Sequence, residues 1–275
     1  MSRIIRMGTA AALACLRDAG IKEPDAIVTG TAYGCLEDTG LFLTSIVERN
    51  EEMLQPATFI QSTHNTIGAQ IALMLHCTGY NNTFVHRGFS FESALLDAAL
   101  LLADEEATSV LAGGIDELTA TSYALLSRFG LYRHTIAGEG AAFFLLAARP
   151  SENDYARLDG MTTFCRPADT REVKQQLLSF LTAHDINPDR IDLVIAGNNG
   201  DSEGDDIYRQ LSSSLFHKTP VIPYKHLCGE YPTSTAFALW MAANQVRSGA
   251  GRILIYNHYL GIYHTAFLLS PAKTR

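Results

Sequence analysis

The stretch NNTFVHRGFSFESALLDAALLLADEE, Asn81 to Glu106, decides the fold class. Its apolar run Thr83-Phe84-Val85 predicts a strand, which meets a tight turn at Arg87-Gly88 and then an amphipathic helix. Many α/β enzymes display a nucleophile at such an elbow, and N–H groups at a helix N-terminus favour negative charge there. No cysteine stands in this turn. The segment therefore predicts a nucleophile elbow that lacks its thiol.

The composition predicts a compact protein with a sizeable core, since 47% of the 275 residues are hydrophobic. A formal charge of −8 with scattered basic residues argues against a nucleic-acid surface. Apolar runs such as AALLLA fall short of the roughly 20 residues that span a bilayer. Residues 1–20 keep a helical periodicity without a cleavage-type site, so we interpret them as a helix and expect a cytoplasmic protein.

The cysteines predict neither a metal centre nor a disulfide framework. They are widely spaced and contain no CxxC pair: Cys15, Cys35, Cys77, Cys165 and Cys228. We interpret them as inert thiols and expect no metal and no cofactor.

Strands alternate with helices in both halves, which predicts an α/β fold with parallel pairing. In the first half we expect helix 2–19, strand 25–30, a long irregular region, helix 66–79, strand 82–86, helix 90–106, strand 109–114 and, after a variable stretch, strand 138–150. In the second half we expect helix 171–185, strand 192–197, helix 206–216, strand 219–224, helix 233–249, strand 252–257 and strand 265–270. The same order occurs twice, so we predict an internal duplication with halves 1–150 and 151–275.

Five phrases in this order resemble the β-ketoacyl synthases of the thiolase superfamily. They are TFIQSTHNTIGAQIALMLHCTGYNNTFVH (58–86), VLAGGIDEL (110–118), GEGAAFFLL (138–146), PYKHLCGEYPTSTAFAL (223–239) and NHYLGIYHTAFLLS (257–270). The resemblance implies two pseudo-duplicated βαβ halves in a layered α-β-α-β-α core. It also implies a strand ahead of helix 2–19, so we expect a truncated or internally initiated chain.

Within that superfamily, three phrases resemble the chain length factors of aryl polyene and flexirubin-type pigment pathways. They are GTAYGCLEDTGLFL (30–43), FIQSTHNTIGAQIAL (59–73) and HRGFSFESALLDA (86–98). Such subunits accompany an active ketosynthase.

The resemblance marks three catalytic positions at which this chain departs from an active ketosynthase. Gly88, give or take one residue, stands where the acylated cysteine belongs. Gly197-Asn198 replaces the first catalytic histidine and Glu230, after Gly229, replaces the second, whereas Lys225 matches the family. Because imidazoles stabilise the enolate and the thioester oxyanion, these losses predict a chain without catalysis of its own.

Other residues near these positions leave alternatives open. Cys228, with His226 as partner, is a candidate displaced nucleophile, whereas Ser90 is interpreted as a helix-capping residue. Asn198 or Asn199 retains an amide donor, and Lys225 with Glu230 is expected to form an ion pair that fills the vacated site.

The expected function is that of a chain length factor in polyketide or fatty-acid-type biosynthesis. The edge strand 82–86 would pair with an active ketosynthase, through which the acyl carrier protein would be engaged. Candidates for the tunnel wall or the interface, for which an ordinary core or interface role is the favoured interpretation of each one individually, are Phe42, Leu43, Gln61, His64, Ile67, Phe84, His86, Arg87 and Phe89. Two alternatives stay open: a self-sufficient acyltransferase that uses unusual residues such as Cys228, and a homodimeric acyl-binding assembly protein.

Overall fold

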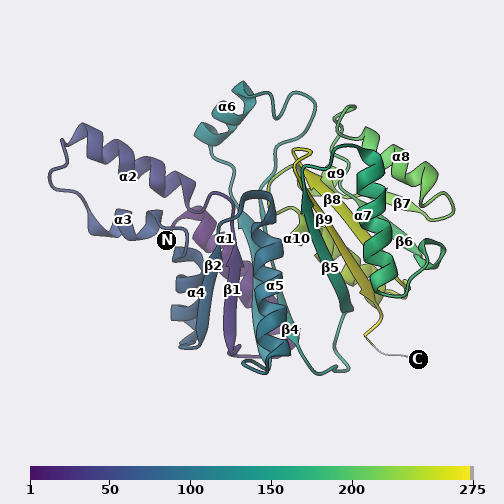
Figure 1. Cartoon of the computed structure of the whole chain (residues 1–275). Coiled ribbons are helices and arrows are strands. Elements are labelled where there is room, and N and C mark those ends of the chain that lie inside the picture. Colours follow the sequence, from purple (N-terminus) through teal and green to yellow (C-terminus); the bar gives the residue numbers. More distant parts are fainter. Residues whose placement is uncertain (273–275) are drawn as a thin grey trace. The chain divides into compact units, whose positions relative to one another are not determined.

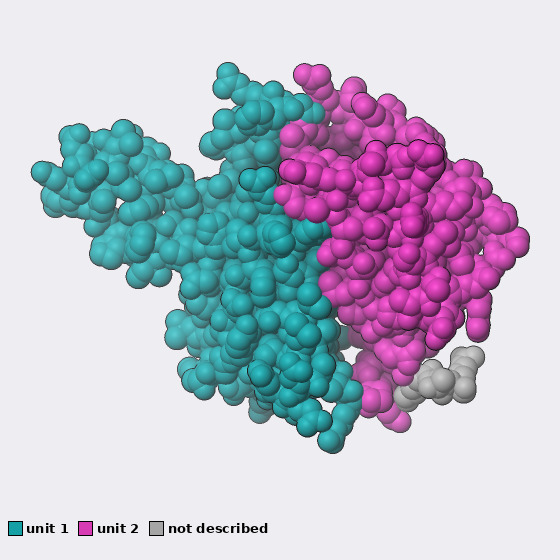
Figure 2. All heavy atoms as spheres, viewed as in Figure 1, with its two compact units in different colours: residues 1–130, 137–149, 231–236 teal, residues 131–136, 150–230, 237–275 magenta. Residues whose placement is uncertain are grey.

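The computed structural model describes residues 1–272, which divide into two compact units. Among the described residues, unit 1 comprises 1–130, 137–149 and 231–236, and unit 2 comprises 131–136, 150–230 and 237–272 (Figure 2). The sequence predicts a single boundary after residue 150. In the structure, short segments near residues 131–136 and 231–236 are assigned instead to the other half's unit.

Unit 1 is built on a four-stranded sheet within the described residues, in the order β2-β1-β3-β4. The strands are β1 (Ala26–Gly30), β2 (Tyr80–Phe84), β3 (Ser109–Asp116) and β4 (Gly140–Ala147). β1 pairs in parallel with β2 and β3, whereas β4 pairs antiparallel with β3. The parallel pairing predicted from the alternation is confirmed for the first three strands.

Helices cover both faces of this sheet (Figure 1). Helices α1 (Arg3–Ala19) and α4 (Thr66–Leu75) share a core with Ile27 and Leu111 of the strands. Helix α5 (Ser90–Ala103) packs against Val28 and Ala112, which point to the opposite face because side chains alternate along a strand.

The sequence analysis expected residues 31–65 to be irregular. In the structure they contain helices α2 (Leu36–Glu48) and α3 (Pro56–Ser62). Pro56 stands at the start of α3, where its missing N–H is not needed by the helix. The variable stretch after β3 contains α6 (Ala120–Arg128), which begins with a capping box between Thr119 and Ser122. The prediction was wrong for these three helices.

The buried carboxylate of Asp116, at the end of β3, joins three segments of unit 1. One oxygen accepts hydrogen bonds from the Thr31 hydroxyl at 3.1 Å and the Ala32 N–H at 2.8 Å, just after β1. The other accepts from the Thr233 N–H at 3.2 Å and its hydroxyl at 2.9 Å. Burial raises the pKa of Asp116 to about 6, although these hydrogen bonds act in the opposite direction.

Unit 2 contains a five-stranded sheet in the order β5-β9-β8-β6-β7, counted over the chain up to residue 272. The strands are β5 (Arg157–Cys165), β6 (Leu193–Ala196), β7 (Val221–Pro223), β8 (Ile253–Tyr259) and β9 (Tyr263–Ser270). The helices that accompany this sheet are α7 (Thr170–Ala183), α8 (Asp206–Ser214), α9 (Lys225–Cys228) and α10 (Thr235–Arg247), together with the short 3-10 turn η2 (Pro188–Arg190). A second such turn, η1 (Arg87–Phe89), belongs to unit 1. α7 and α8 pack on one face, against Val194, Leu254 and Leu268.

The two sheets repeat one strand pattern, as the sequence order predicted. β2-β1-β3-β4 corresponds to β7-β6-β8-β9, with the first three strands parallel and the last antiparallel in both. β5, which the sequence analysis missed, pairs antiparallel with β9. Among residues 1–272, no strand pairs in the same way with β4.

A glycine at the end of β1 sets the position of α5. A Cβ atom on Gly30 would lie 2.3 Å from the backbone oxygen of Ser90, the first residue of α5. The start of this helix therefore rests directly on the strand, and no larger residue fits between them.

We expect Gly30→Ala to destabilise the protein by about 3 kcal/mol, because the added methyl group must displace backbone rather than a side chain. Gly40→Ala is the matched control: Gly40 is exposed in α2 and its Cβ would have no atom within 4 Å. That change is expected to stabilise by about 0.5–1 kcal/mol, since alanine is the better helix former. Urea unfolding compares the two, and an unchanged midpoint for Gly30→Ala would contradict the packing argument.

Candidate functional site: an altered elbow and a buried ion pair

The elbow between β2 and α5 displays an arginine. Arg87 has φ of +51°, the left-handed conformation that side chains other than glycine rarely adopt. Arg87 is exposed, whereas the neighbouring Gly88 is buried within the short turn η1. The side chain at the apex of the turn is therefore that of Arg87, one residue before the predicted position.

The hydroxyl of Ser90 is committed to the shape of this turn. It donates to the backbone oxygen of Arg87 at 2.8 Å and accepts from the N–H of His86 at 2.9 Å, and Ser90 is fully buried. The expectation that Ser90 caps α5 was wrong, because Ser90 is the first helical residue and bonds backwards to the turn. The Arg87 guanidinium and the engaged, buried Ser90 hydroxyl are not activated nucleophiles, whereas the Ser93 hydroxyl of α5 lies 3.3 Å from the His86 Nδ1.

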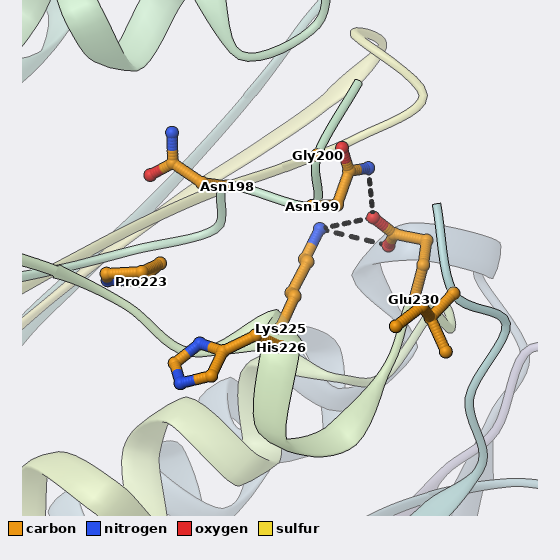
Figure 3. A pocket seen from close by; sticks show the side chains of 8 residues that line it. Asn198, Asn199, Gly200, Pro223, Lys225, His226 and Glu230 are labelled. Atoms are coloured by element: carbon orange, nitrogen blue, oxygen red, sulfur yellow. Dashed lines mark hydrogen bonds and ion pairs between the residues drawn. The ribbon is translucent and has the colours of Figure 1, made fainter. Parts of the chain in front are cut away.

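The second group of predicted positions lines a pocket in unit 2 with a volume of about 240 Å³. Asn198, Asn199 and Gly200 follow β6, Pro223 ends β7, and Lys225 and His226 begin α9. Glu230 belongs to the same lining (Figure 3), which Ile136 completes. Residues that follow neighbouring parallel strands meet at one edge of the sheet, where α/β proteins commonly place their sites.

A buried ion pair occupies this pocket, as the sequence predicted for Lys225 and Glu230. The Lys225 Nζ lies 2.7 Å and 2.9 Å from the two Glu230 oxygens, and the two residues are 2% and 6% exposed (Figure 3). Lys225 also donates to the backbone oxygen of His258 at 3.2 Å. The Asn199 side-chain amide donates to Glu230 at 2.6 Å.

These contacts engage the charged groups of Lys225 and Glu230 with partners inside the protein. The three donors of the ammonium group are matched by three acceptors, and a carboxylate accepts hydrogen bonds where an imidazole would donate one to an oxyanion. Asn198 also lines the pocket. The arrangement neutralises its own charges rather than presenting them to a reacting group.

A side chain at position 197, where the sequence analysis expects a catalytic histidine to be missing, would require Asn257 and Tyr208 to move. A Cβ on Gly197 would lie 2.1 Å from the Asn257 side-chain oxygen and 2.7 Å from the Tyr208 hydroxyl. The space of an imidazole is thus taken by an amide and a phenol from β8 and α8.

Two histidines of the closing hairpin, His258 and His264, belong to this region, and the sequence analysis did not single them out. They face each other across β8 and β9, with ring centroids 5.5 Å apart. His258 stacks on Tyr208 at 5.1 Å and His264 on Phe164 at 5.1 Å. The sequence signal was the pair itself, six residues apart around the Leu260-Gly261 turn.

The hydrogen bonds of His258 define a neutral imidazole. Its Nδ1 accepts from the N–H of Gly261 at 3.2 Å, so its Nε2 carries the proton and donates to the Gly204 oxygen at 3.0 Å. Burial, with nearby Lys225, lowers the pKa of His258 to about 3. Burial also lowers the pKa of His264.

The other candidates lie in different environments. Ile67 is fully buried in the unit 1 core, so it faces no tunnel within that unit. Phe42 is half-buried against Phe59, with ring centroids 5.4 Å apart. The exposed His64 lies against Gly34.

The remaining candidates are placed as follows. Gln61, Phe84 and Phe89 are half-buried, Leu43 and His86 are exposed, and the His86 ring lies 5.7 Å from that of Phe89. Cys228 is half-buried, with its sulfur 3.4 Å from the Gly229 oxygen.

The sequence model of a protein family, described as the N-terminal domain of β-ketoacyl synthase, matches residues 1–148, more than half of the chain. The chain therefore belongs to the β-ketoacyl synthase family. No curated protein matches it.

Solved structures show the same thiolase-like α/β fold. The ishigamide ketosynthase/chain length factor has a TM-score of 0.81 at 17% identity, covering 98% of this chain and 81% of that one. A β-ketoacyl synthase from Burkholderia phymatum STM815 has a TM-score of 0.80 at 16% identity, covering 99% and 83%. The ketosynthase ApeO in complex with its chain length factor ApeC, from Xenorhabdus doucetiae, has a TM-score of 0.77 at 15% identity, covering 98% and 84%.

Breaking the ion pair from either side is expected to destabilise the protein strongly. Lys225→Met or Glu230→Met should each cost about 3–5 kcal/mol, because each leaves a buried charged partner uncompensated. The double variant Lys225→Met/Glu230→Met should lose much less than the sum. Urea unfolding of the four proteins in a double-mutant cycle measures the coupling, and additive losses would show that the two groups act independently.

We expect His258 to reduce stability in acid. Its folded pKa of about 3 lies below the ordinary 6.5, so the unfolded chain binds more protons between these values and stability falls as the pH drops below about 6.5. The loss should reach about 2 kcal/mol at pH 5. Nearby Lys225 and His264 act in the same direction and Asp201 opposes them.

His258→Gln should remove that part of the pH dependence while leaving the part due to His264. The exposed His217→Gln is the matched control for a histidine replacement outside this site. Chemical denaturation from pH 4.5 to pH 8 measures both, and a wild-type slope in His258→Gln would contradict the assignment.

Proposed function

We propose that this chain is a non-catalytic, ketosynthase-like chain length factor that pairs with a catalytic β-ketoacyl synthase in polyene-type lipid or pigment biosynthesis. The observation that carries this proposal is the buried ion pair in the pocket lining, in which Lys225 and Glu230 satisfy each other. Arg87 at the apex of the elbow supports it, because a guanidinium accepts no acyl group. Similar structures include two that are titled as ketosynthases with a chain length factor.

The surface around β2 supports a partnership. β2 is an edge strand of the unit 1 sheet as far as the chain is described, and an exposed edge favours pairing with another chain. Large apolar side chains that are 44–69% exposed flank it: Leu73 and Met74 of α4, Tyr80 and Val85, and Leu96 and Leu100 of α5. Together they form the β2 surface, an apolar rim on both sides of an open strand.

A catalytic ketosynthase is the partner that this chain's chemistry requires. It supplies the cysteine and the two histidines whose positions here hold Arg87 or Gly88, Gly197 and Glu230. In this proposal the acyl carrier protein is engaged through the complex. A related structure is titled as a type II polyketide acyl-carrier protein bound to its ketosynthase. The residues of this chain would then form part of the wall of the partner's acyl tunnel.

Among residues 1–272, every helix is too short or too polar to cross a membrane.

The test is acylation of the isolated chain. The protein and, in parallel, a catalytic ketosynthase of the same source are incubated with an acyl carrier protein that carries a labelled acyl chain, and intact masses are measured. We expect an adduct on the ketosynthase and none on this chain. A stoichiometric adduct at Cys228 or Ser90 would overturn the proposal, as would failure of co-expressed chains to form a heterodimer.

A further inference from the structure

Helices α2 and α3 form an arm, residues 36–62, that extends away from the sheet of unit 1 (Figure 1). The two helices lie against each other through Phe42 and Phe59, whose ring centroids are 5.4 Å apart. Both helices are fully described, and of their side chains only that of Asp38 is buried. The arm therefore packs chiefly on itself.

Six large apolar side chains of the arm face solvent in the isolated chain. Their exposed fractions range from 54% to 89%, for Leu41, Leu43, Val47, Met53, Phe59 and Ile60. An apolar surface of this kind on a short helical pair marks an interaction site, because short helices gain most of their stability by burying such side chains. The arm is therefore expected to be covered in the functional state.

The tip of the arm is held in an uncommon conformation. Asn50, Glu51 and Met53 have φ of +49°, +67° and +50°, in the region that favours glycine. Arg49, the residue after α2, donates to the backbone oxygen of Met53 at 3.0 Å. This arrangement presents Met53, which is 89% exposed, as a projecting apolar side chain.

The charge of the arm limits what covers it. Residues 36–62 contain five carboxylates and one basic residue, Arg49. Glu48, Glu51 and Glu52 are exposed at the tip beside Val47 and Met53. An anionic membrane surface repels this pattern, and so does a second copy of a chain whose formal charge is −8. A protein surface with an apolar centre and a basic rim is complementary to it.

We propose that the arm docks on such a basic-rimmed surface of the catalytic ketosynthase subunit and that its acidic tip favours this heterodimer over a homodimer. The inference rests on the proposed function and deepens it, since it assigns the choice of partner to residues 47–53. Val47 and Met53 supply apolar contact, and the three glutamates select against an acidic partner by repulsion. The β2 surface supplies the remaining contact area.

The experiment measures binding and self-association with the full-length chain. Each catalytic ketosynthase encoded in the same genome is purified, and its affinity for this chain is measured by calorimetry at 50 mM and 300 mM salt. Analytical ultracentrifugation of the isolated chain gives its homodimer constant. Four variants are compared with the wild type: Val47→Ser/Met53→Ser, Glu48→Lys/Glu52→Lys, Leu96→Glu/Leu100→Glu in the β2 surface, and the control Glu23→Lys/Glu203→Lys.

The control changes the net charge as much as the tip reversal does, but at exposed positions outside the arm. We expect the tip reversal to weaken the heterodimer at least about tenfold at low salt, to lose its salt dependence and to strengthen self-association. The Val47→Ser/Met53→Ser variant should weaken the heterodimer about tenfold at both salt concentrations. Both sites are exposed, so folding, checked by circular dichroism, should be unchanged.

The outcomes separate the two proposals. If the Leu96→Glu/Leu100→Glu variant loses the heterodimer while the arm variants bind as the wild type does, the arm proposal fails and the proposed function stands. If no ketosynthase binds the wild-type chain, the proposed function fails. Wild-type binding to phosphatidylcholine or phosphatidylglycerol vesicles that Val47→Ser/Met53→Ser abolishes would assign the arm to a membrane and overturn the inference.

Discussion

A buried ion pair persists only where each of its donors and acceptors is satisfied, and this requirement organises the proposed site in unit 2. Lys225 on α9 meets Glu230 five residues later in the chain, and Asn199 after β6 donates a further hydrogen bond to the carboxylate. The backbone oxygen of His258 on β8 accepts the last ammonium donor. Three strand ends are thereby held at fixed positions. The same bonds consume the groups from which an oxyanion site would be made.

The elbow in unit 1 obeys a different constraint, which is backbone packing. The start of α5 lies on Gly30, so the chain has to turn sharply after β2 whatever residue occupies the apex. Arg87 accepts an unfavourable φ to make that turn, and the Ser90 hydroxyl bonds to both sides of it. The shape of the elbow is therefore held by backbone packing and by the Ser90 hydroxyl.

Much of the fold was predictable because buried elements carry a periodic pattern. The strands and helices of the two duplicated sheets were placed correctly, whereas α2 and α3 were missed because apolar residues such as Leu41, Leu43 and Val47 follow no single buried face. β5 was missed because it is an edge strand interrupted by a bulge between Leu158 and Gly160.

The candidate site was predictable only in part. The Lys225–Glu230 pair followed from the residue types and their proximity in sequence. By contrast, only a backbone angle distinguishes Arg87 from Gly88 as the residue at the apex, and only the register of β8 with β9 brings His258 opposite His264. Both facts depend on contacts that one sequence does not encode locally. The same holds for the arm. Its apolar side chains are exposed, so they give no helical pattern of core residues, and they become interpretable only as a surface that contacts another molecule.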